Sequence, residues 1–187
     1  MQRSISALAW LAVATWVGGA IGFGIALDGY SHALHPLGLL GASGVPHARA
    51  FNLVAFVLPG LLLAGAGLGL RARVGAAGWP SRIGATLAML SALAFAVQGV
   101  FPLDPGHLDS GDSRYHAAAW TLWWVSFAPG AALLASGARP RWVHVAAAIA
   151  VPVLVLVAPA LLGAALAQRL AFAAWFGWWL LALRWPR

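Results

Sequence analysis

Six long stretches of this chain are almost free of charge. The apolar runs lie at about 5–27, 50–70, 83–101, 117–137, 143–162 and 166–185. A helix that crosses a membrane needs roughly 20 apolar residues, and each run is close to that length. Hydrophobic residues make up 62% of the 187 residues and charged residues 8%, more apolar surface than a soluble domain of this size can bury. The sequence therefore predicts an all-α polytopic membrane protein, with about six transmembrane helices in one bundle and one domain spanning 1–187.

The basic residues indicate how such a bundle is oriented. All eleven are arginines, and alternating the six runs across the membrane divides them unequally. One side receives Arg3, Arg71, Arg73, Arg82, Arg139, Arg141, Arg184 and Arg187, whereas the other receives Arg49, Arg114 and Arg169. Because cytoplasmic loops carry the excess of positive charge, we expect a multi-pass protein of the cytoplasmic (inner) membrane with both termini in the cytoplasm. Topology thus accounts for the net charge of +7, and no nucleic-acid partner is expected.

The first apolar run and the absence of cysteine narrow the chemistry further. The run from Ile5 to Leu27 is too long for a signal-peptide core and lacks a clear small-x-small cleavage site, so we expect a retained helix. With no cysteine, disulfides, thiolate metal sites and cysteine nucleophiles are excluded. There is no P-loop for a nucleotide.

Three arginines on the predicted outer side suggest an anion-binding pocket. Arg49, Arg114 and Arg169 lie near the starts of the second, fourth and sixth runs, where helix N-termini already carry partial positive charge. Cations at these positions imply nearby anions, either the chain's own aspartates in a structural latch or a bound ligand. Intramembrane polar residues usually form interhelical hydrogen bonds, but near such arginines they can also line a site. We therefore predict a ligand-binding set of Arg49, Asn52, Gln98, Arg114 and Arg169.

The loop after the third run concentrates carboxylates and imidazoles. Mixed nitrogen and oxygen ligands suit Zn or Mn, so this loop is a candidate for a divalent metal. The candidate ligands are His32, His35, Asp104, His107, Asp109, Asp112 and His116. Asp, Gly, Pro and Ser are also ordinary turn formers, and no known metal signature is present. For acid–base chemistry the candidates are Asp104, His107 and His116, although no catalytic triad is fixed.

Several short motifs resemble a known family. They are His35-Pro36-Leu37-Gly38, Phe51-Asn52-Leu53, Phe101-Pro102-Leu103-Asp104 and Gln168-Arg169-Leu170-Ala171-Phe172. With their spacing they resemble the bacterial membrane family called domain of unknown function 998, over nearly the whole chain. The resemblance implies six helices in a bacterial inner membrane, and it supplies no activity and no site residues.

Three functional hypotheses follow. In the first, the protein binds an anionic lipid or small ligand in a polar pocket on the extracytoplasmic face. In the second, it is an outer-face enzyme, dependent on a metal or on His and Asp, that acts on a lipid or its headgroup. In the third, it is a structural subunit, with membrane lipids around it and either another copy of itself or another membrane protein as its partner.

Overall fold

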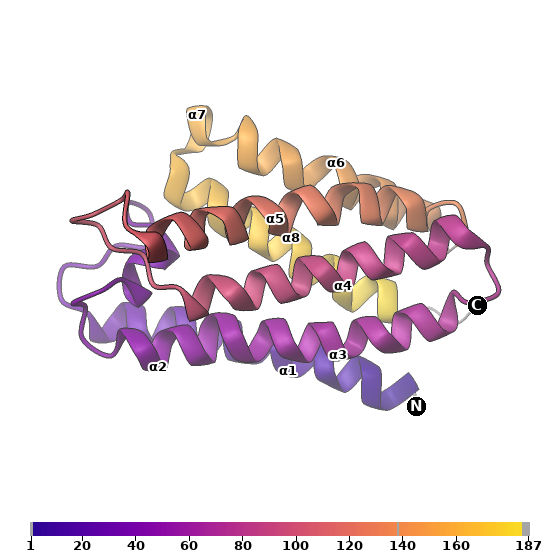
Figure 1. Ribbon diagram of the computed structural model, residues 1–187, viewed down its shortest axis with the longest axis horizontal. Coiled ribbons are helices and arrows are strands. Elements are labelled where there is room, and N and C mark those ends of the chain that lie inside the picture. The colour runs from indigo at the N-terminus through magenta and orange to yellow at the C-terminus, as the bar shows by residue number, and fades with distance from the viewer. Residues whose placement is uncertain (1, 138, 185–187) are drawn as a thin grey trace.

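The computed structural model describes residues 2–137 and 139–184, and within them every regular element is helical. Figure 1 shows a bundle of long helices that run back and forth along its longest axis. The elements are α1 (Gln2–Ala26), η1 (Leu37–Gly41), α2 (Ala48–Asn52), η2 (Leu53–Val57), α3 (Leu58–Arg73), α4 (Trp79–Val100), α5 (Gly111–Leu134), α6 (Arg141–Leu156), α7 (Pro159–Leu162) and α8 (Ala164–Arg184). The expected all-α polytopic bundle is confirmed.

The bundle has two unlike ends (Figure 1). We call one the long-loop end; it carries the segments 27–47 and 101–110 and the turn around α7. We call the other the basic end; it carries both ends of the described chain and the short connections from α3 to α4 and from α5 to α6. Of the arginines predicted to share one side, the described ones fall at the basic end, and Arg187 lies outside the described residues.

Within the described residues, five helices, rather than six, are long and apolar enough to cross a membrane. They are Arg3–Ala26, Ala48–Arg73, Trp79–Val100, Gly111–Leu134 and Ala164–Arg184. The predicted helix over 143–162 is instead divided into α6 and α7. A 16-residue helix rises only about 24 Å, less than the roughly 30 Å hydrocarbon core. Pro159 explains the break, because it has no N–H to donate to the Val155 carbonyl and its ring would clash with that carbonyl in a continuous helix.

Several helices begin earlier than the apolar runs suggest, because polar residues occupy their first turns. The start of α5 is the clearest case, since it lies six residues before the predicted 117. The Ser110 hydroxyl accepts a hydrogen bond from the Ser113 N–H at 3.2 Å and caps the helix. Asp112 adds a negative charge to the first turn, where the helix dipole favours one.

A π-helical turn, η2, interrupts the second spanning helix. Leu58 N–H donates to the carbonyl of Leu53, five residues back, instead of four. Pro59 follows at once, and its ring would clash with the carbonyl of Ala55 in a regular α-helix. The wider turn accommodates the proline and changes the direction in which the residues before it face.

An aromatic core fills the interior. Phe95 of α4 stacks on Trp175 of α8 with ring centroids 4.9 Å apart, and Trp123 of α5 meets Trp175 edge-on at 5.8 Å. All three side chains are fully buried. Glycines let the helix backbones approach around this core, since a Cβ added to Gly60 would lie only 2.7 Å from the Ala92 carbonyl. This closely packed core is the base against which the long loops fold.

The segment 27–47 packs back onto that base. Leu37 and Leu40 of η1 are almost completely buried. The Leu37 N–H donates to the Gln168 Oε1 of α8 at 2.9 Å, which fixes η1 against the last helix. Ser43 N–H donates to the Leu103 carbonyl at 2.8 Å, which joins the two long loops. These contacts shape the cavity described next.

Candidate functional site

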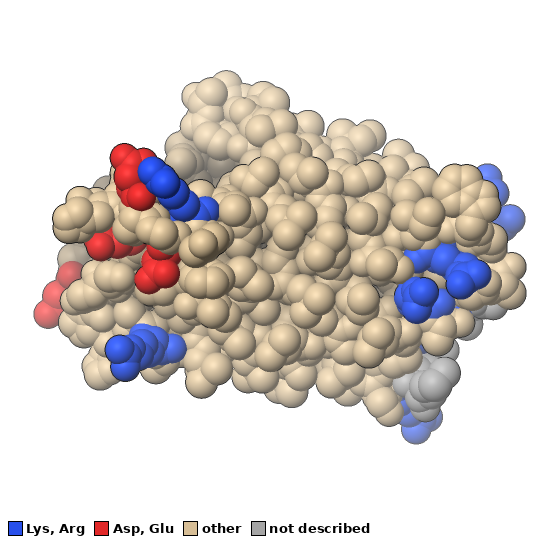
Figure 2. Space-filling model, in the orientation of Figure 1, with Lys and Arg blue, Asp and Glu red and all other residues tan. Residues whose placement is uncertain are grey.

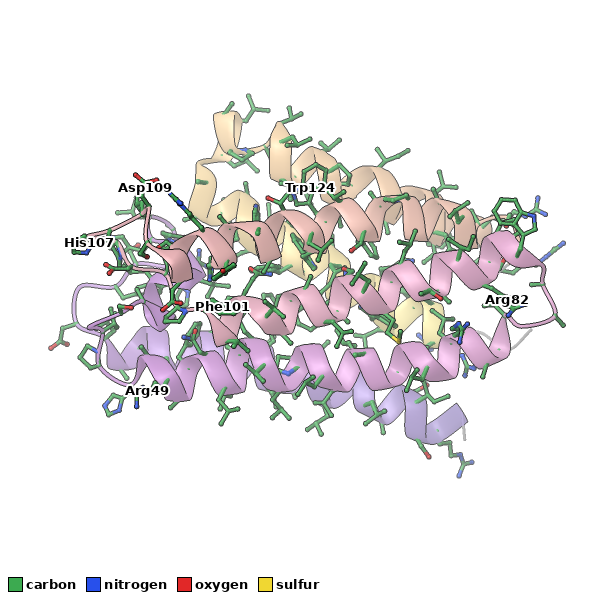
Figure 3. All side chains as sticks on the ribbon, viewed as in Figure 1. Arg49, Arg82, Phe101, His107, Asp109 and Trp124 are labelled. Carbon is green, nitrogen blue, oxygen red and sulfur yellow. The ribbon has the colours of Figure 1, made fainter. Side chains whose placement is uncertain are left out.

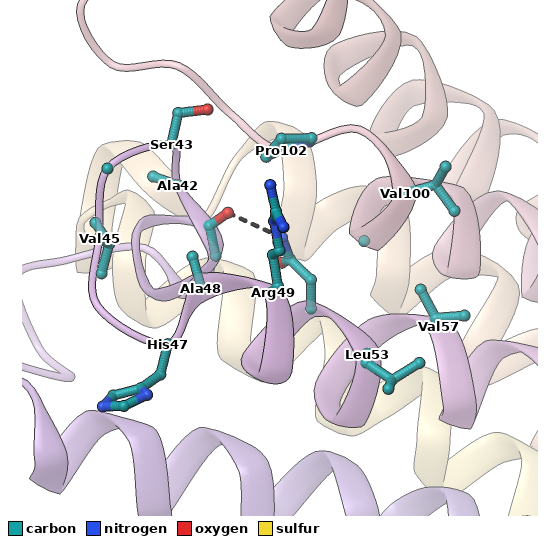
Figure 4. A pocket seen from close by; sticks show the side chains of 14 residues that line it. Ala42, Ser43, Val45, His47, Ala48, Arg49, Leu53, Val57, Val100 and Pro102 are labelled. Atoms are coloured by element: carbon teal, nitrogen blue, oxygen red, sulfur yellow. Dashed lines mark hydrogen bonds between the residues drawn. The ribbon is translucent and has the colours of Figure 1, made fainter.

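A cavity of about 820 Å³ opens at the long-loop end, between the start of α2 and the end of α4. This volume lies within the range of about 300–1,000 Å³ typical of small-molecule sites. The loop residues 41–45, 47 and 48 and Pro102 form its rim, where Ser43 and His47 are the polar side chains, whereas Leu53, Val57 and Val100 form its apolar part (Figure 4). Leu53 and Val100 are also more than half exposed, at 58% and 57%, so the apolar part opens onto the outer surface of the bundle.

Arg49 supplies the only charged side chain among the described residues that line this cavity. Its guanidinium rises from the first turn of α2 toward Pro102 (Figure 4). No described residue accepts a hydrogen bond from the Arg49 side chain or pairs with its charge. A cation without a counterion beside an open cavity favours an anionic occupant.

The start of α2 adds to the same electrostatic preference. The helix opens after His47, whose φ of 61° is left-handed and whose side chain does not cap the first turn. The first N–H groups of a helix have no partner within the helix, and here no acidic residue lies in the first turn. Because α2 continues through η2 and α3 as one helix over Ala48–Arg73, its dipole also favours a negative charge here.

Asn52 lies one turn below Arg49 and holds the cavity wall. Its Nδ2 donates to the Gly41 carbonyl at 2.9 Å (Figure 4). A Cβ on Gly41 would collide with the Asn52 Oδ1, so the loop can approach the helix this closely only with glycine at that position. Of the five predicted ligand-binding residues, Arg49 and Asn52 thus share one cavity, with different roles.

The other three predicted ligand-binding residues lie elsewhere. Gln98 is 1% exposed and is not part of the cavity lining. Arg114 is exposed and lies 3.9 Å from the fully exposed Asp109 carboxylate, an ion pair of the kind that contributes little. Arg169 faces a separate groove between α1 and α8. The predicted set is therefore not one pocket.

The loop with the candidate acid–base residues uses its polar groups for its own turn. Asp104 Oδ1 accepts hydrogen bonds from the N–H groups of Gly106 and His107, at 2.9 and 3.2 Å. Asp104 Oδ2 lies 3.3 Å from the His107 Nδ1, but the His107 side chain is 80% exposed. Figure 3 shows His107 and Asp109 at the outer tip of the loop. This pattern is that of an aspartate-stabilised turn.

The histidines proposed as metal ligands are held apart by other contacts. His116 Nδ1 lies 3.0 Å from the carbonyls of both Gln98 and Phe101, so it carries a proton and donates to them. His35 Nδ1 accepts from the Ser31 N–H at 3.0 Å. Asp112 lies in the first turn of α5. In the described ranges, no three His or Asp side chains gather closely enough to hold a metal ion.

Arg169 is held by a residue that the sequence did not single out, Tyr30. One Arg169 nitrogen donates to the Tyr30 hydroxyl at 2.5 Å and lies 3.3 Å from the His32 Nδ1. Burial raises the pKa of Tyr30, although Arg169 opposes this, so the hydroxyl stays protonated at neutral pH. Burial and the charge of Arg169 both lower the pKa of His32. A tyrosine ahead of two histidines in a loop gave no signal for this contact.

On the face shown in Figure 2, charged side chains lie at the two ends of the molecule. Figure 2 shows acidic atoms only at the long-loop end in this view, basic atoms at both ends, and an uncharged band between them. Such a band is the surface expected to face lipid. Trp10 at 63% and Ile25 at 78% are among the exposed apolar side chains of α1.

Comparison of the chain with family models, with curated proteins and with solved structures finds no significant match. The resemblance to the domain of unknown function 998 therefore stays a prediction. Function has to be argued from the geometry of the cavity.

Proposed function

We propose that the protein binds an anionic membrane lipid in the cavity beside Arg49. The lipid's phosphate lies against the Arg49 guanidinium and the N–H groups of Arg49 and Ala50, because the Ala48 N–H already donates to the Val45 carbonyl. One acyl chain runs past Leu53 and Val57 into the surrounding bilayer. The observation that carries the proposal is an arginine with no partner among the described residues, in a cavity whose opposite side is apolar and exposed at the bundle surface.

The shape of the cavity favours an amphiphile over a compact soluble anion. A soluble anion needs polar groups on all sides, whereas this cavity has polar groups only at its rim. The side chains of Leu53 and Val100 have no polar atoms to solvate a second charge, but they pack favourably against hydrocarbon. Lipid binding thus uses both halves of the cavity.

Our proposal places the long-loop end on the extracytoplasmic side of a bacterial inner membrane. The excess of arginine at the basic end supports this orientation. The chain has no cysteine, so single cysteines report on it directly. In intact cells, a membrane-impermeant maleimide should label Ser43→Cys and spare Ala76→Cys; the reverse pattern would invert the orientation.

Lipid retention tests the binding proposal. Wild-type protein and Arg49→Gln are placed in nanodiscs of phosphatidylcholine with a minor fraction of phosphatidylglycerol, and bound lipid is counted by native mass spectrometry. Loss of a charge-assisted hydrogen bond should lower the preference for phosphatidylglycerol by roughly tenfold.

Arg114→Gln is the matched control, because it removes one positive charge from the same end of the bundle. It should bind lipid as the wild type does. Equal retention by wild type and Arg49→Gln would contradict the proposal, and an equal loss in both variants would reduce it to an effect of net charge.

A further inference from the structure

A second groove lies between α1 and α8, away from the Arg49 cavity. It has a volume of about 290 Å³, and its walls are almost wholly apolar. Its wall residues include Trp16, Val17 and Ile21 of α1 and Leu170 and Ala173 of α8. Val17, Ile21 and Leu170 are 38–52% exposed, so the groove opens to the lipid-facing side of the bundle.

Only one end of this groove is polar. There Arg169 and His32 close it at the long-loop end. Arg169 is half-buried, and its terminal nitrogens donate to the Ala165 carbonyl at 2.8 Å and to the Tyr30 hydroxyl. Its Nε is buried, and no described residue accepts a hydrogen bond from it. The terminal nitrogens thus hold the guanidinium in place, and the Nε–H has no acceptor among the described residues.

The charge of Arg169 is not compensated by the described chain. The carboxylates that form ion pairs there, Asp104 and Asp109, pair with His107 and Arg114. Tyr30 stays neutral, and His32 presents an unprotonated nitrogen to the guanidinium. A half-buried cation next to hydrocarbon calls for an anion, because the cost of removing a charge from water is offset only by a partner.

We propose that this groove is a separate binding site for an acidic phospholipid of the surrounding bilayer. The lipid phosphate pairs with Arg169, and one acyl chain lies between α1 and α8. Charge complementarity selects the headgroup, and the apolar walls select an amphiphile rather than a free phosphate. The phosphate competes with Tyr30 for the guanidinium, because Tyr30 is its closest neutral partner. This site shares no lining residue with the Arg49 cavity and stands or falls independently of it.

Photocrosslinking tests the proposal. The probe is phosphatidylglycerol with a diazirine on one acyl chain, incorporated into phosphatidylcholine nanodiscs with the full chain. Crosslinks should map to Val17, Ile21 or Ala173, and a tenfold excess of unlabelled phosphatidylglycerol, but not of phosphatidylcholine, should suppress them.

Four variants separate binding from a purely structural role of Arg169. Arg169→Gln, which removes the charge, and Ala173→Leu, which fills the groove and leaves the charge, should each reduce these crosslinks about tenfold. Tyr30→Phe, which removes the competing hydroxyl, should retain or increase them, and Arg114→Gln should leave them unchanged.

The unfolding transition of each purified variant shows whether it still folds. Crosslinks near Val57 and Val100, counted in the same samples, report separately on the Arg49 cavity. Undiminished crosslinking of Ala173→Leu, or of a folded Arg169→Gln, would overturn the proposal. Loss in Tyr30→Phe equal to that in Arg169→Gln would show that Arg169 serves only to fasten the loop.

Discussion

The two ends of the bundle connect the spanning helices in different ways. At the basic end, short connections join the helices, and the described charges are all positive. At the long-loop end, segment 27–47 folds back and buries Leu37 and Leu40 against the helices. In the other long loop, segment 101–110, the Asp104 carboxylate is used to stabilise the loop's own turn. A charged residue is therefore not by itself evidence of a site. Arg49 is such evidence because no described residue pairs with its charge.

The largest difference between the ends should appear when a methyl group is added to a loop glycine. In Gly41→Ala the new Cβ collides with Asn52, so we expect a loss of about 1–3 kcal/mol of unfolding free energy. In Gly75→Ala at the basic end the new Cβ meets its nearest atom, the Ala72 carbonyl, at 3.4 Å. This control should change stability by less than about 0.5 kcal/mol. Unfolding in mixed detergent micelles measures both; equal effects would remove the contrast.

A smaller difference is expected for hydroxyl groups. The Ser113 hydroxyl is buried and accepts a hydrogen bond from the Asp104 N–H at 3.0 Å. Ser113→Ala should cost about 1 kcal/mol, because the loop loses this bond and the link to Ser110. Thr86→Ala, near the basic end, removes an exposed hydroxyl bonded only to its own helix and should cost little. The same unfolding assay compares them, and a costlier Thr86→Ala would refute the ranking.

The smallest effect concerns pH. The pKa of His32 lies below 6.5 in the folded protein, because burial and Arg169 disfavour its charged form. The unfolded chain then binds more protons than the folded one as pH falls below about 6.5, so acid weakens the attachment of segment 27–36. Since the His32 side chain is only slightly buried, both influences on its pKa are weak and the effect on stability should be small.

Hydrogen exchange of that segment between pH 8 and 5, corrected for intrinsic rates, measures this effect. His32→Gln should abolish the acid-induced loosening, and His107→Gln, at an exposed position of the same end, should retain it. Loosening that persists in His32→Gln would assign it to another group.

The spanning helices were predictable from the sequence because a helix that crosses lipid needs a long apolar run, however it packs against the other helices. The division of 143–162 was less visible, since Ala158 and Pro159 lie within an apolar run that satisfies the length rule. Local sequence shows that a proline is present but not whether neighbouring helices support the freed backbone groups.

The candidate site was predictable only in part. Arg49 and Asn52 are three residues apart on one helix, and this spacing alone places them near one another. Arg169 and Tyr30 are 139 residues apart, and only tertiary packing brings them together. Gln98 faces the interior because of the rotation of α4, which an evenly apolar helix does not reveal.

The π-helical turn at Leu53–Val57 sets the direction in which Arg49 points around the helix axis, and so determines whether Arg49 faces the cavity. One residue of an α-helix turns it by about 100°, so deleting a single residue here would swing Arg49 a quarter-turn or more around the helix axis. The half of the helix from Pro59 onward, locked against α4 at Gly60, would keep its contacts. A single insertion or deletion in this turn would therefore change both the cavity's cation and the packing of the buried Phe51, and leave the helix from Pro59 onward in place.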